Sequence, residues 1–386
     1  MFDRQIHSCE DARRLARRRL PRMVFDYMDG AAGEGFGEMQ NRRVMQDIRL
    51  QPAVLVNVEH RSLGVSVFDH QSRRPFGVSP MGMCNLAHPG ADLMLARQAA
   101  RFHSPVGVST VASTPLETMI ETAEGHAWFQ FYFSGDGSVV NKLIDRAQAA
   151  GYRTLVVTLD VAEVGRRPRE LRRGFKMPFR IGVPQFIDFA LHPSWSLSTL
   201  ANGRPEMANF GGPHGEFDRT ESRARADWED LDRIRQQWKG NLVVKGVLNT
   251  ADALRLKAAG VDAIQVSSHG GRQLDAAPYP ILALREIRSV VGEDFPLFFD
   301  SGIRSGEDVL KAYAMGADFV FLGRSMLYSL AARGQTGMEK MWDIYSDEIS
   351  IGMAQLGMTS LQQRPQAMLP RQHEYRRVTG PCRAES

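Results

Sequence analysis

Cysteines are few in this sequence and form no recognisable pattern. Its 386 residues include three, at positions 9, 84 and 382, which are odd in number, far apart and not arranged as a CxxC pair. A disulfide framework and a structural zinc site are therefore not supported, and we expect a reducing compartment. The histidines are also scattered, without the spacing of a metal site. No metal is predicted.

Long apolar runs are missing as well. No stretch approaches the ~18 residues of a membrane span, and the N-terminus lacks the apolar segment of a signal peptide. We expect a cytoplasmic protein, or one peripheral on the inner face of the cell membrane. The net charge of +4 and the pI near 9.0 come mainly from scattered arginines without interleaved aromatics. Nucleic acid is therefore not an expected partner.

The remaining composition is that of an ordinary globular protein, with 43% hydrophobic and 24% charged residues. After a helical segment at about residues 9–28, short apolar runs typical of buried strands alternate with amphipathic stretches. The predicted strands are 76–79, 105–109, 127–132, 154–159, 242–245, 263–267, 296–300 and 318–322. The predicted helices are 91–103, 138–150, 250–259, 280–291 and 306–315. Eight such units predict an α/β fold of the (β/α)₈ TIM-barrel type, with an open doubly wound sheet as the competing fold.

Two regions interrupt this alternation. Residues 29–75 have several glycines, but these do not spell GxGxxG and follow a helix, so we expect an N-terminal extension packed on the barrel. Residues 175–225, after the fourth strand, are rich in proline and glycine and predict a long loop insertion. A disordered insertion, a lid, and a membrane- or partner-docking segment are all open for it. We expect residues 1–370 to form one barrel domain and 371–386 a polar C-terminal tail.

The C-terminal ends of the predicted strands carry polar or small residues. The motif VSSHGGRQLD at 266–275 places His269 and Arg272 just after a predicted strand. This pair is typical of a general base beside an arginine that binds an anion. DSGIRSG at 300–306 and LGRS at 322–325 follow the last two strands, where barrels commonly bind phosphate on backbone N–H groups. Any one such group is typical of an ordinary surface loop. Eight of them on the rim where barrels gather catalytic groups predict an active site with a phosphate-bearing ligand.

These motifs, together with VFDYMDGAA and FQFY, resemble those of the FMN-dependent enzymes that oxidise L-2-hydroxy acids, among them glycolate oxidase, L-lactate dehydrogenase and mandelate dehydrogenase. The resemblance runs from Leu20 to about Leu361. It implies a barrel that binds FMN and oxidises a lactate- or mandelate-like acid to the 2-keto acid, with electrons passed to a quinone-type acceptor. An oxidase that uses O₂ and yields H₂O₂ is the alternative. A homo-oligomer, specifically a tetramer, is also implied.

The resemblance assigns roles to individual residues. His269 would be the general base and Asp160 would orient its ring, with Tyr132 and Arg272 completing the catalytic group. The substrate-binding residues would be Tyr27, Tyr132, Arg167 and Arg272. Lys245 would place positive charge where the flavin becomes negative on reduction. The FMN-binding residues would be Pro80, Met81, Gly82, Ser109, Gln130, Thr158, Lys245, Ser267, Asp300, Gly302, Arg304, Gly323 and Arg324.

Three positions depart from the usual family pattern. Ser268 stands where asparagine is usual, next to the expected base. Pro168 replaces an acidic residue after Arg167, and because proline restricts the residue before it, it puts the placement of that arginine in question. Gly82 is typical of the mandelate dehydrogenases, whereas many oxidases have alanine, which favours a quinone-type acceptor. A barrel isomerase or aldolase, and a flavin-binding protein without activity, are further alternatives.

The insertion also resembles that of bacterial lactate dehydrogenases, in which HPxW is followed by NGRP; here these are residues 192–195 and 202–205. Because those relatives are membrane-associated, we hypothesise that residues 186–197 dock on a membrane and pass electrons to quinone. Val111 and Val164 are predicted to line a substrate pocket with room for a side chain larger than that of glycolate. The apolar residues of the insertion that underlie the docking hypothesis are Phe186, Ile187, Phe189, Leu191, Trp195 and Leu197.

Overall fold

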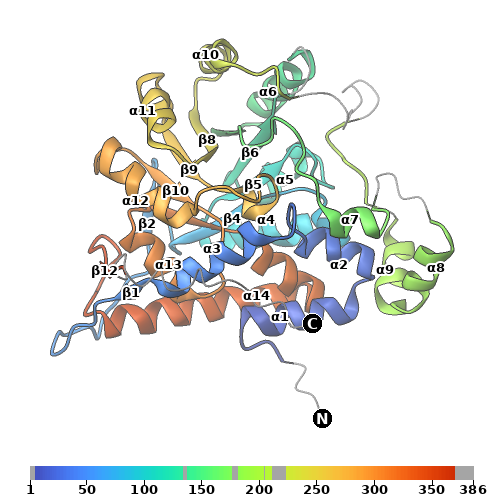
Figure 1. The fold of residues 1–386 in the computed structure, drawn as a ribbon, viewed down its shortest axis with the longest axis horizontal. Helices are drawn as coiled ribbons and strands as arrows, with labels where there is room; N and C mark the ends of the chain where they lie inside the picture. Colours follow the sequence, from blue (N-terminus) through green and yellow to red (C-terminus); the bar gives the residue numbers. More distant parts are fainter. Residues whose placement is uncertain (1–4, 134–136, 176–180, 204, 211–222, 370–386) are drawn as a thin grey trace, which may run out of the picture.

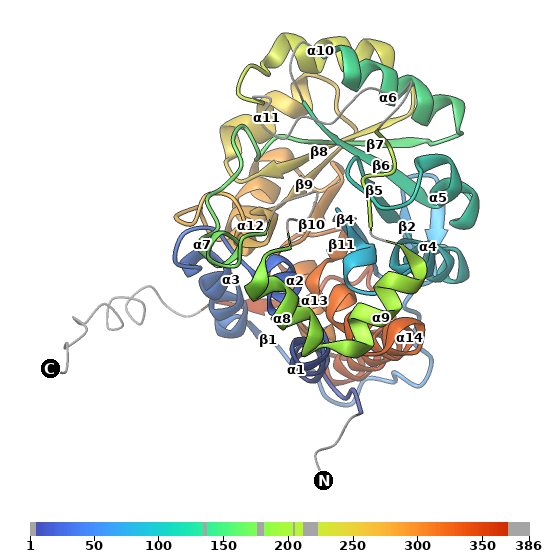
Figure 2. The ribbon, with the colours of Figure 1, turned by 90° about the vertical axis from the view of Figure 1, so that its right-hand side faces the viewer.

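The protein is described by a computed structural model, which covers residues 5–133, 137–175, 181–203, 205–210 and 223–369. Eight parallel strands close into a barrel in the order β10-β11-β4-β5-β6-β7-β8-β9 (Figure 2). They are β4 (Phe76–Met81), β5 (Val106–Ser109), β6 (Ala127–Tyr132), β7 (Thr154–Thr158), β8 (Asn241–Val247), β9 (Ala263–Val266), β10 (Leu297–Phe299) and β11 (Phe319–Leu322). All eight predicted strands are present, and the closed (β/α)₈ barrel is confirmed over the open sheet.

Helices cover the outside of the barrel (Figure 2). The five helices predicted between the strands are each confirmed to within one residue, because local signals fix both the apolar face and the start of each helix. In α12, for example, Pro280 occupies the first turn, and Ile281, Leu284 and Ile287 recur at spacings of three and are buried against the strands. The covering helices are α4 (Ala91–Phe102), α5 (Leu116–Thr122), α6 (Ser138–Ala149), α10 (Trp228–Gln237), α11 (Thr250–Ala258), α12 (Pro280–Val291), α13 (Gly306–Ala314) and α14 (Arg324–Gln355).

The N-terminal end of the barrel is closed by a hairpin of β2 (Val65–Val67) and β3 (His70–Ser72). Phe68, at the tip of the hairpin, packs on Trp128 and Phe298 inside the barrel, with ring centroids 5.6 and 5.5 Å away. Aromatic side chains thus fill the lower interior. The open space for a ligand lies toward the other end, where the strands end.

The N-terminal helical segment is broken, which corrects the prediction of one helix over 9–28. The structure has α1 (Cys9–Arg19) and α2 (Arg22–Asp29), with Leu20 between them in an extended conformation. Pro21 explains the break, because proline disfavours helical geometry in the preceding residue. A third helix, α3 (Phe36–Asp47), lies within the extension. The extension is tied down beyond it by β1 (Arg49–Leu50), which pairs with β12 (Ala367–Met368).

The predicted long insertion after the fourth barrel strand, β7, is present, and where it is described it is largely helical, which the sequence did not indicate. It contains α7 (Pro168–Arg172), α8 (Val183–Ala190) and α9 (Pro193–Asn202). Two of the prolines that suggested a loop, Pro184 and Pro193, stand in the first turns of α8 and α9, where their missing N–H costs no hydrogen bond. Residues 176–180, 204 and 211–222 of the insertion, and the predicted tail, lie outside the described residues.

The helices α8 and α9 form a projection at one edge of the molecule, beside α2 (Figure 1). The indole Nε1 of Trp195 donates to the carbonyl of Leu86 at 2.8 Å, and the N–H of Met23 donates to Asp188 at 3.2 Å. No residue of α8 is buried. Within the described part of the chain, no helix is long and apolar enough to cross a membrane.

Candidate active site

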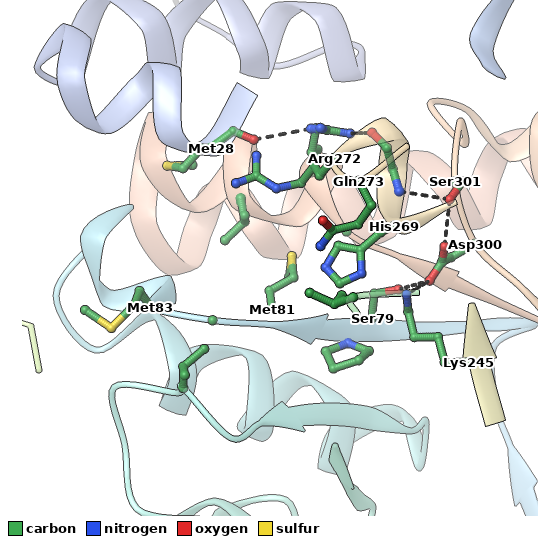
Figure 3. A pocket seen from close by; sticks show the side chains of 18 of the residues that line it. Met28, Ser79, Met81, Met83, Lys245, His269, Arg272, Gln273, Asp300 and Ser301 are labelled. Carbon is green, nitrogen blue, oxygen red and sulfur yellow. Dashed lines mark hydrogen bonds and ion pairs between the residues drawn. The ribbon is translucent and has the colours of Figure 1, made fainter. Parts of the chain in front are cut away.

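A cavity of about 220 Å³ opens at the C-terminal ends of the barrel strands (Figure 3). Residues from eight predicted regions of the sequence meet there, so these residues form one site. The predicted site residues that line it are Tyr27, Pro80, Met81, Gly82, Tyr132, Arg167, Lys245, His269, Arg272, Asp300, Gly302, Arg304, Gly323 and Arg324. The remaining predicted residues, Ser109, Gln130, Thr158, Asp160 and Ser267, do not line this cavity and occupy the adjacent strand ends.

His269 and Asp160 form a hydrogen-bonded pair at the strand ends. The distance from His269 Nδ1 to Asp160 Oδ1 is 2.9 Å. A carboxylate at this position places the ring proton on Nδ1 and leaves the other ring nitrogen as a base. Burial lowers the pKa of His269, with Asp160 opposing the shift, so the imidazole is neutral at pH 7. Burial alone would raise the pKa of Asp160, but His269 and Lys245 hold it below its ordinary value. The pair has the charge states that general base catalysis needs.

Arg272 and Arg167 stand side by side at the cavity wall. Arg272 Nη1 donates to the backbone carbonyls of Tyr27 and Gly30 at 2.7 and 2.8 Å, and its Nη2 donates to Glu170 Oε1 at 2.9 Å. The same Glu170 oxygen accepts from Arg167 Nη1 at 3.4 Å. Glu170 is buried, so a single carboxylate neutralises part of the charge of two guanidinium groups. The remaining positive charge suits a carboxylate ligand.

Pro168 does not remove Arg167 from the site. The backbone of Arg167 is extended, with φ −116° and ψ 92°, as expected before a proline. Pro168 then occupies the first turn of α7, where proline is favoured. The side chain of Arg167 lines the cavity beside that of Arg272.

Several buried polar atoms at the strand ends have no partner within the described residues. They are both side-chain polar atoms of Gln130, at the end of β6, and Oγ1 of Thr158, at the end of β7. Buried polar groups are rarely left without hydrogen bonds, so such a group is typical of a ligand site. The amide of Gln130 offers both a donor and an acceptor, and the Thr158 hydroxyl can do either. This set fits the heteroatoms of a flavin ring.

Lys245 lies beneath the cavity and is held by hydrogen bonds. Its Nζ donates to Ser267 Oγ at 2.8 Å and lies 3.6 Å from Asp300 Oδ2. Burial alone would lower the pKa of Lys245, but Asp300 and Asp160 raise it, so the ammonium stays charged. Asp300 in turn accepts from Ser79, Gln265, Ser267 and Ser301. Ser267 and Asp300 therefore fix the position of the lysine.

The far end of the cavity carries the predicted phosphate residues. Gly302 has φ +96°, and α14 begins at Arg324 directly after Gly323, so a helix N-terminus faces this end. Arg324 donates to the carbonyls of Gly270 and Gly30 at 2.8 and 2.7 Å. Arg304 pairs with Glu38 at 3.1 Å. Both arginines line the cavity while their guanidinium groups bond to protein groups.

Sequence reasoning missed several residues of this site. Glu170 could have been found because it stands three residues after Arg167, on the same side of a helical turn. Gln273, whose side chain accepts from the N–H of Gly165 at 2.7 Å, directly follows the motif arginine. No local signal pointed to the others, which come from the insertion. The missed lining residues include Phe175, Met207, Arg223 and Gln273.

Comparison with known proteins agrees with this geometry. A family model described as FMN-dependent dehydrogenase matches residues 16–371. The chain belongs to the FMN-dependent dehydrogenase family. It is therefore an oxidoreductase that acts on CH–OH groups with FMN as its cofactor, and the resemblance seen in the motifs is confirmed.

Individual relatives are similar over most of their length. The chain is 37% identical to (S)-mandelate dehydrogenase of Pseudomonas putida, over 92% of each chain. It is 37% identical to an L-lactate dehydrogenase of Pseudomonas syringae pv. syringae, over 93% of this chain and 97% of that one. The crystal structure of the monotopic membrane protein (S)-mandelate dehydrogenase matches with a TM-score of 0.89 at 36% identity, covering 93% of this chain and 98% of that one. A mandelate oxidase structure matches with a TM-score of 0.82 at 32% identity, covering 95% and 99%.

Proposed function

We propose that this FMN-dependent dehydrogenase oxidises an L-2-hydroxy acid to the corresponding 2-keto acid. The observation that carries the proposal is that the His269–Asp160 pair and the two arginines, Arg167 and Arg272, converge at one strand-end site. A base beside a carboxylate clamp suits a substrate that carries its hydroxyl and its carboxylate on neighbouring carbons. The names of the relatives, which act on mandelate and lactate, support the same substrate class.

The roles of the protein groups follow from their chemistry. Arg167 and Arg272 bind the substrate carboxylate, and the hydroxyl groups of Tyr27 and Tyr132 hydrogen-bond to the substrate. Neutral His269 removes a proton, either from the α-carbon or from the hydroxyl. Asp160 then stabilises the imidazolium, as the carboxylate does in the serine hydrolase triad. General base catalysis of this kind typically contributes about 10²- to 10⁴-fold.

FMN, when bound, accepts the two electrons that leave the substrate. Gln130, Thr158 and Ser109 would supply hydrogen bonds for its ring, and Pro80, Met81 and Gly82 would contact it. Lys245 places a positive charge where negative charge develops on reduction. The phosphate end is assigned to Gly302, Arg304, Gly323 and Arg324.

The substrate side chain is proposed to be apolar and larger than that of glycolate, as in lactate or mandelate. Val111 and Val164 line the cavity, and Val161, Phe175 and Met207 are among its other apolar lining residues. Gly82 leaves space beside Val111, because it has no Cβ. An apolar wall of this kind favours an apolar side chain.

The electron acceptor is proposed to be a membrane quinone, with O₂ as the alternative. Residues 186–197 would contact the membrane, because Phe186, Leu191 and Leu197 are each about two-thirds or more exposed on the α8–α9 projection. The name of the monotopic mandelate dehydrogenase supports the same arrangement. A peripheral position on the inner face of the membrane and a homotetramer complete the proposal.

Anaerobic mixing with the L and D forms of lactate and mandelate tests the reaction. We expect L-2-hydroxy acids to bleach the flavin spectrum and D forms to leave it unchanged. Reoxidation by a soluble quinone, faster than by O₂, would support the acceptor. Failure of every 2-hydroxy acid to bleach a fully loaded enzyme would contradict the function.

Vesicle flotation with anionic phospholipid tests the membrane contact. The triple variant Phe186→Ser/Leu191→Ser/Leu197→Ser should lose flotation and keep its rate of flavin reduction. A matched control is Ile351→Ser, which removes an exposed apolar side chain on α14. Equal flotation of the triple variant and the parent would contradict the assignment to this segment.

A further inference from the structure

A buried hydrogen bond connects the N-terminal extension with the residue that precedes the expected base. Asn41, on α3, donates from Nδ2 to Ser268 Oγ at 2.9 Å. The two residues are 4% and 6% exposed, so water cannot replace either partner easily. This pair lies at the position where Ser268 departs from the family pattern.

The backbone at His269 needs support from its surroundings. His269 has φ +54°, in the left-handed region that residues with a Cβ rarely adopt. Such a conformation persists only where the surrounding structure holds it. One support is Ser301, whose Oγ accepts from the N–H groups of Ser268 and Gly270 at 3.1 Å each.

Helix α3 packs directly against the other side of this turn. A Cβ on Gly271 would lie 2.6 Å from the backbone nitrogen of Glu38, so only glycine allows the approach. A Cβ on Gly302 would likewise lie 3.0 Å from the carbonyl oxygen of Asn41. Asn41 therefore sits between the turn that carries His269 and the loop that follows Asp300. Its side-chain bond to Ser268 fixes the first residue of the turn.

We propose that Asn41 is a positioning residue for His269. By holding Ser268, it keeps the turn in the conformation that directs the imidazole at Asp160 and into the cavity. This inference rests on the proposed function of His269 as the base, and it adds a residue from outside the barrel to the catalytic arrangement.

Stopped-flow flavin reduction of Asn41→Ala tests the proposal. We expect the maximal rate to fall about 10- to 100-fold, the order expected when a reacting group is misplaced by about 1 Å. The substrate concentration at half-maximal rate should change less than about twofold, because the arginine clamp is untouched. In a double-mutant cycle, Asn41→Ala/Ser268→Ala should be no slower than Asn41→Ala alone, because both changes remove one bond. The swapped variant Asn41→Ser/Ser268→Asn should recover most of the rate.

The matched control is Ser104→Ala, which removes another buried side-chain bond, the 2.6 Å contact between Ser72 and Ser104 at the closed end of the barrel. It should lower thermal stability without changing the rate per bound FMN. A wild-type rate for Asn41→Ala, or a loss matched by Ser104→Ala, would overturn the proposal.

Titration of the His269 imidazole, followed by NMR, reports the same placement without turnover. We expect Asn41→Ala to lower the pKa of His269, since Asp160 raises it in the wild type, and Ser104→Ala to leave it in place. An unchanged titration in Asn41→Ala would count against the proposal. If no 2-hydroxy acid reduces the wild-type flavin, the proposed function fails, and this titration still decides the placement.

Discussion

The imidazole of His269 and the carboxylate of Asp160 stand 109 residues apart in the chain and meet at a hydrogen bond of 2.9 Å. They belong to the ends of β9 and β7, which are separated by one strand in the barrel. Closure of the sheet brings them together. The relative position of His269 and Asp160 is thus determined by the closed barrel and not by a local motif.

The pH dependence of flavin reduction should report this pair. Burial lowers the pKa of His269 below its ordinary 6.5. The base therefore stays neutral, and the rate of flavin reduction does not change with pH, until the pH falls below that lowered pKa. Asp160→Asn removes the charge that opposes the shift, so the acidic limb should move to still lower pH. The rate should fall about 10²- to 10⁴-fold. Stopped-flow reduction across pH measures both effects, and an acidic limb that stays in place would argue against the pair.

Glu170 should control the substrate affinity through the two arginines. Glu170→Ala leaves two buried guanidinium groups without their shared partner, which costs more than the loss of one hydrogen bond. We expect the apparent KM for a 2-hydroxy acid to rise about tenfold, which is about 1.4 kcal/mol. Glu170→Gln keeps an acceptor oxygen and should cause the smaller loss. Steady-state kinetics with equal KM values for both variants and the parent would rule this role out.

Gly82 and Val111 should be coupled sterically. A Cβ on Gly82 would lie 2.4 Å from Val111 Cγ2, well inside contact distance. Overpacking of this kind typically costs about 1–3 kcal/mol, so Gly82→Ala should slow reduction by mandelate. Val111→Ala removes the clashing methyl group, and the double variant should recover the rate. Simple addition of the two losses in the double variant would contradict this coupling.

Asp92 should make stability depend on pH. It is buried in the first turn of α4 and accepts from the N–H of Ser113 at 2.8 Å, and burial raises its pKa to about 6. In the unfolded chain this carboxyl loses its proton near pH 3.8, whereas in the folded protein it keeps the proton until about pH 6. The folding free energy that the bound proton contributes is therefore fully present below pH 3.8 and is lost as the pH rises from there to about 6. Relative to Asp92→Asn, the wild type should lose about 3 kcal/mol of unfolding free energy between about pH 4 and pH 7. Denaturant unfolding of both proteins at both pH values measures their difference in unfolding free energy. The same difference at both pH values would rule out a raised pKa for Asp92.

The barrel and its family were predictable from the sequence because their signals are local. Each strand is a short apolar run, and each helix has its own apolar spacing, so the bounds of the barrel strands and of the five predicted barrel helices were found to within two residues. The strand-end motifs were also informative, because a closed parallel barrel brings all strand ends to one rim. The fold and the FMN-dependent family that these two signals predicted are both confirmed. The roles of individual residues stay predictions.

Other features depend on contacts between distant segments, which no local pattern announces. The helical state of residues 183–202 was missed because prolines were interpreted as loop signals, although they stand in helix first turns. Likewise, nothing around Asn41 suggests that it reaches Ser268, 227 residues further along the chain. Glu170 has no strand-end position, although its spacing of three residues from Arg167 could have suggested it. Residues that act by supporting others are set by tertiary packing.

The central claim is that His269 is the base in the oxidation of an L-2-hydroxy acid. The most direct test is anaerobic stopped-flow reduction of the wild type and of His269→Gln, each fully loaded with FMN, by the best L-2-hydroxy acid. Glutamine is close in size to histidine but cannot accept the proton as a base. We expect the variant to retain FMN and to be reduced about 10²- to 10⁴-fold more slowly. Reduction of the variant at the wild-type rate would contradict the account.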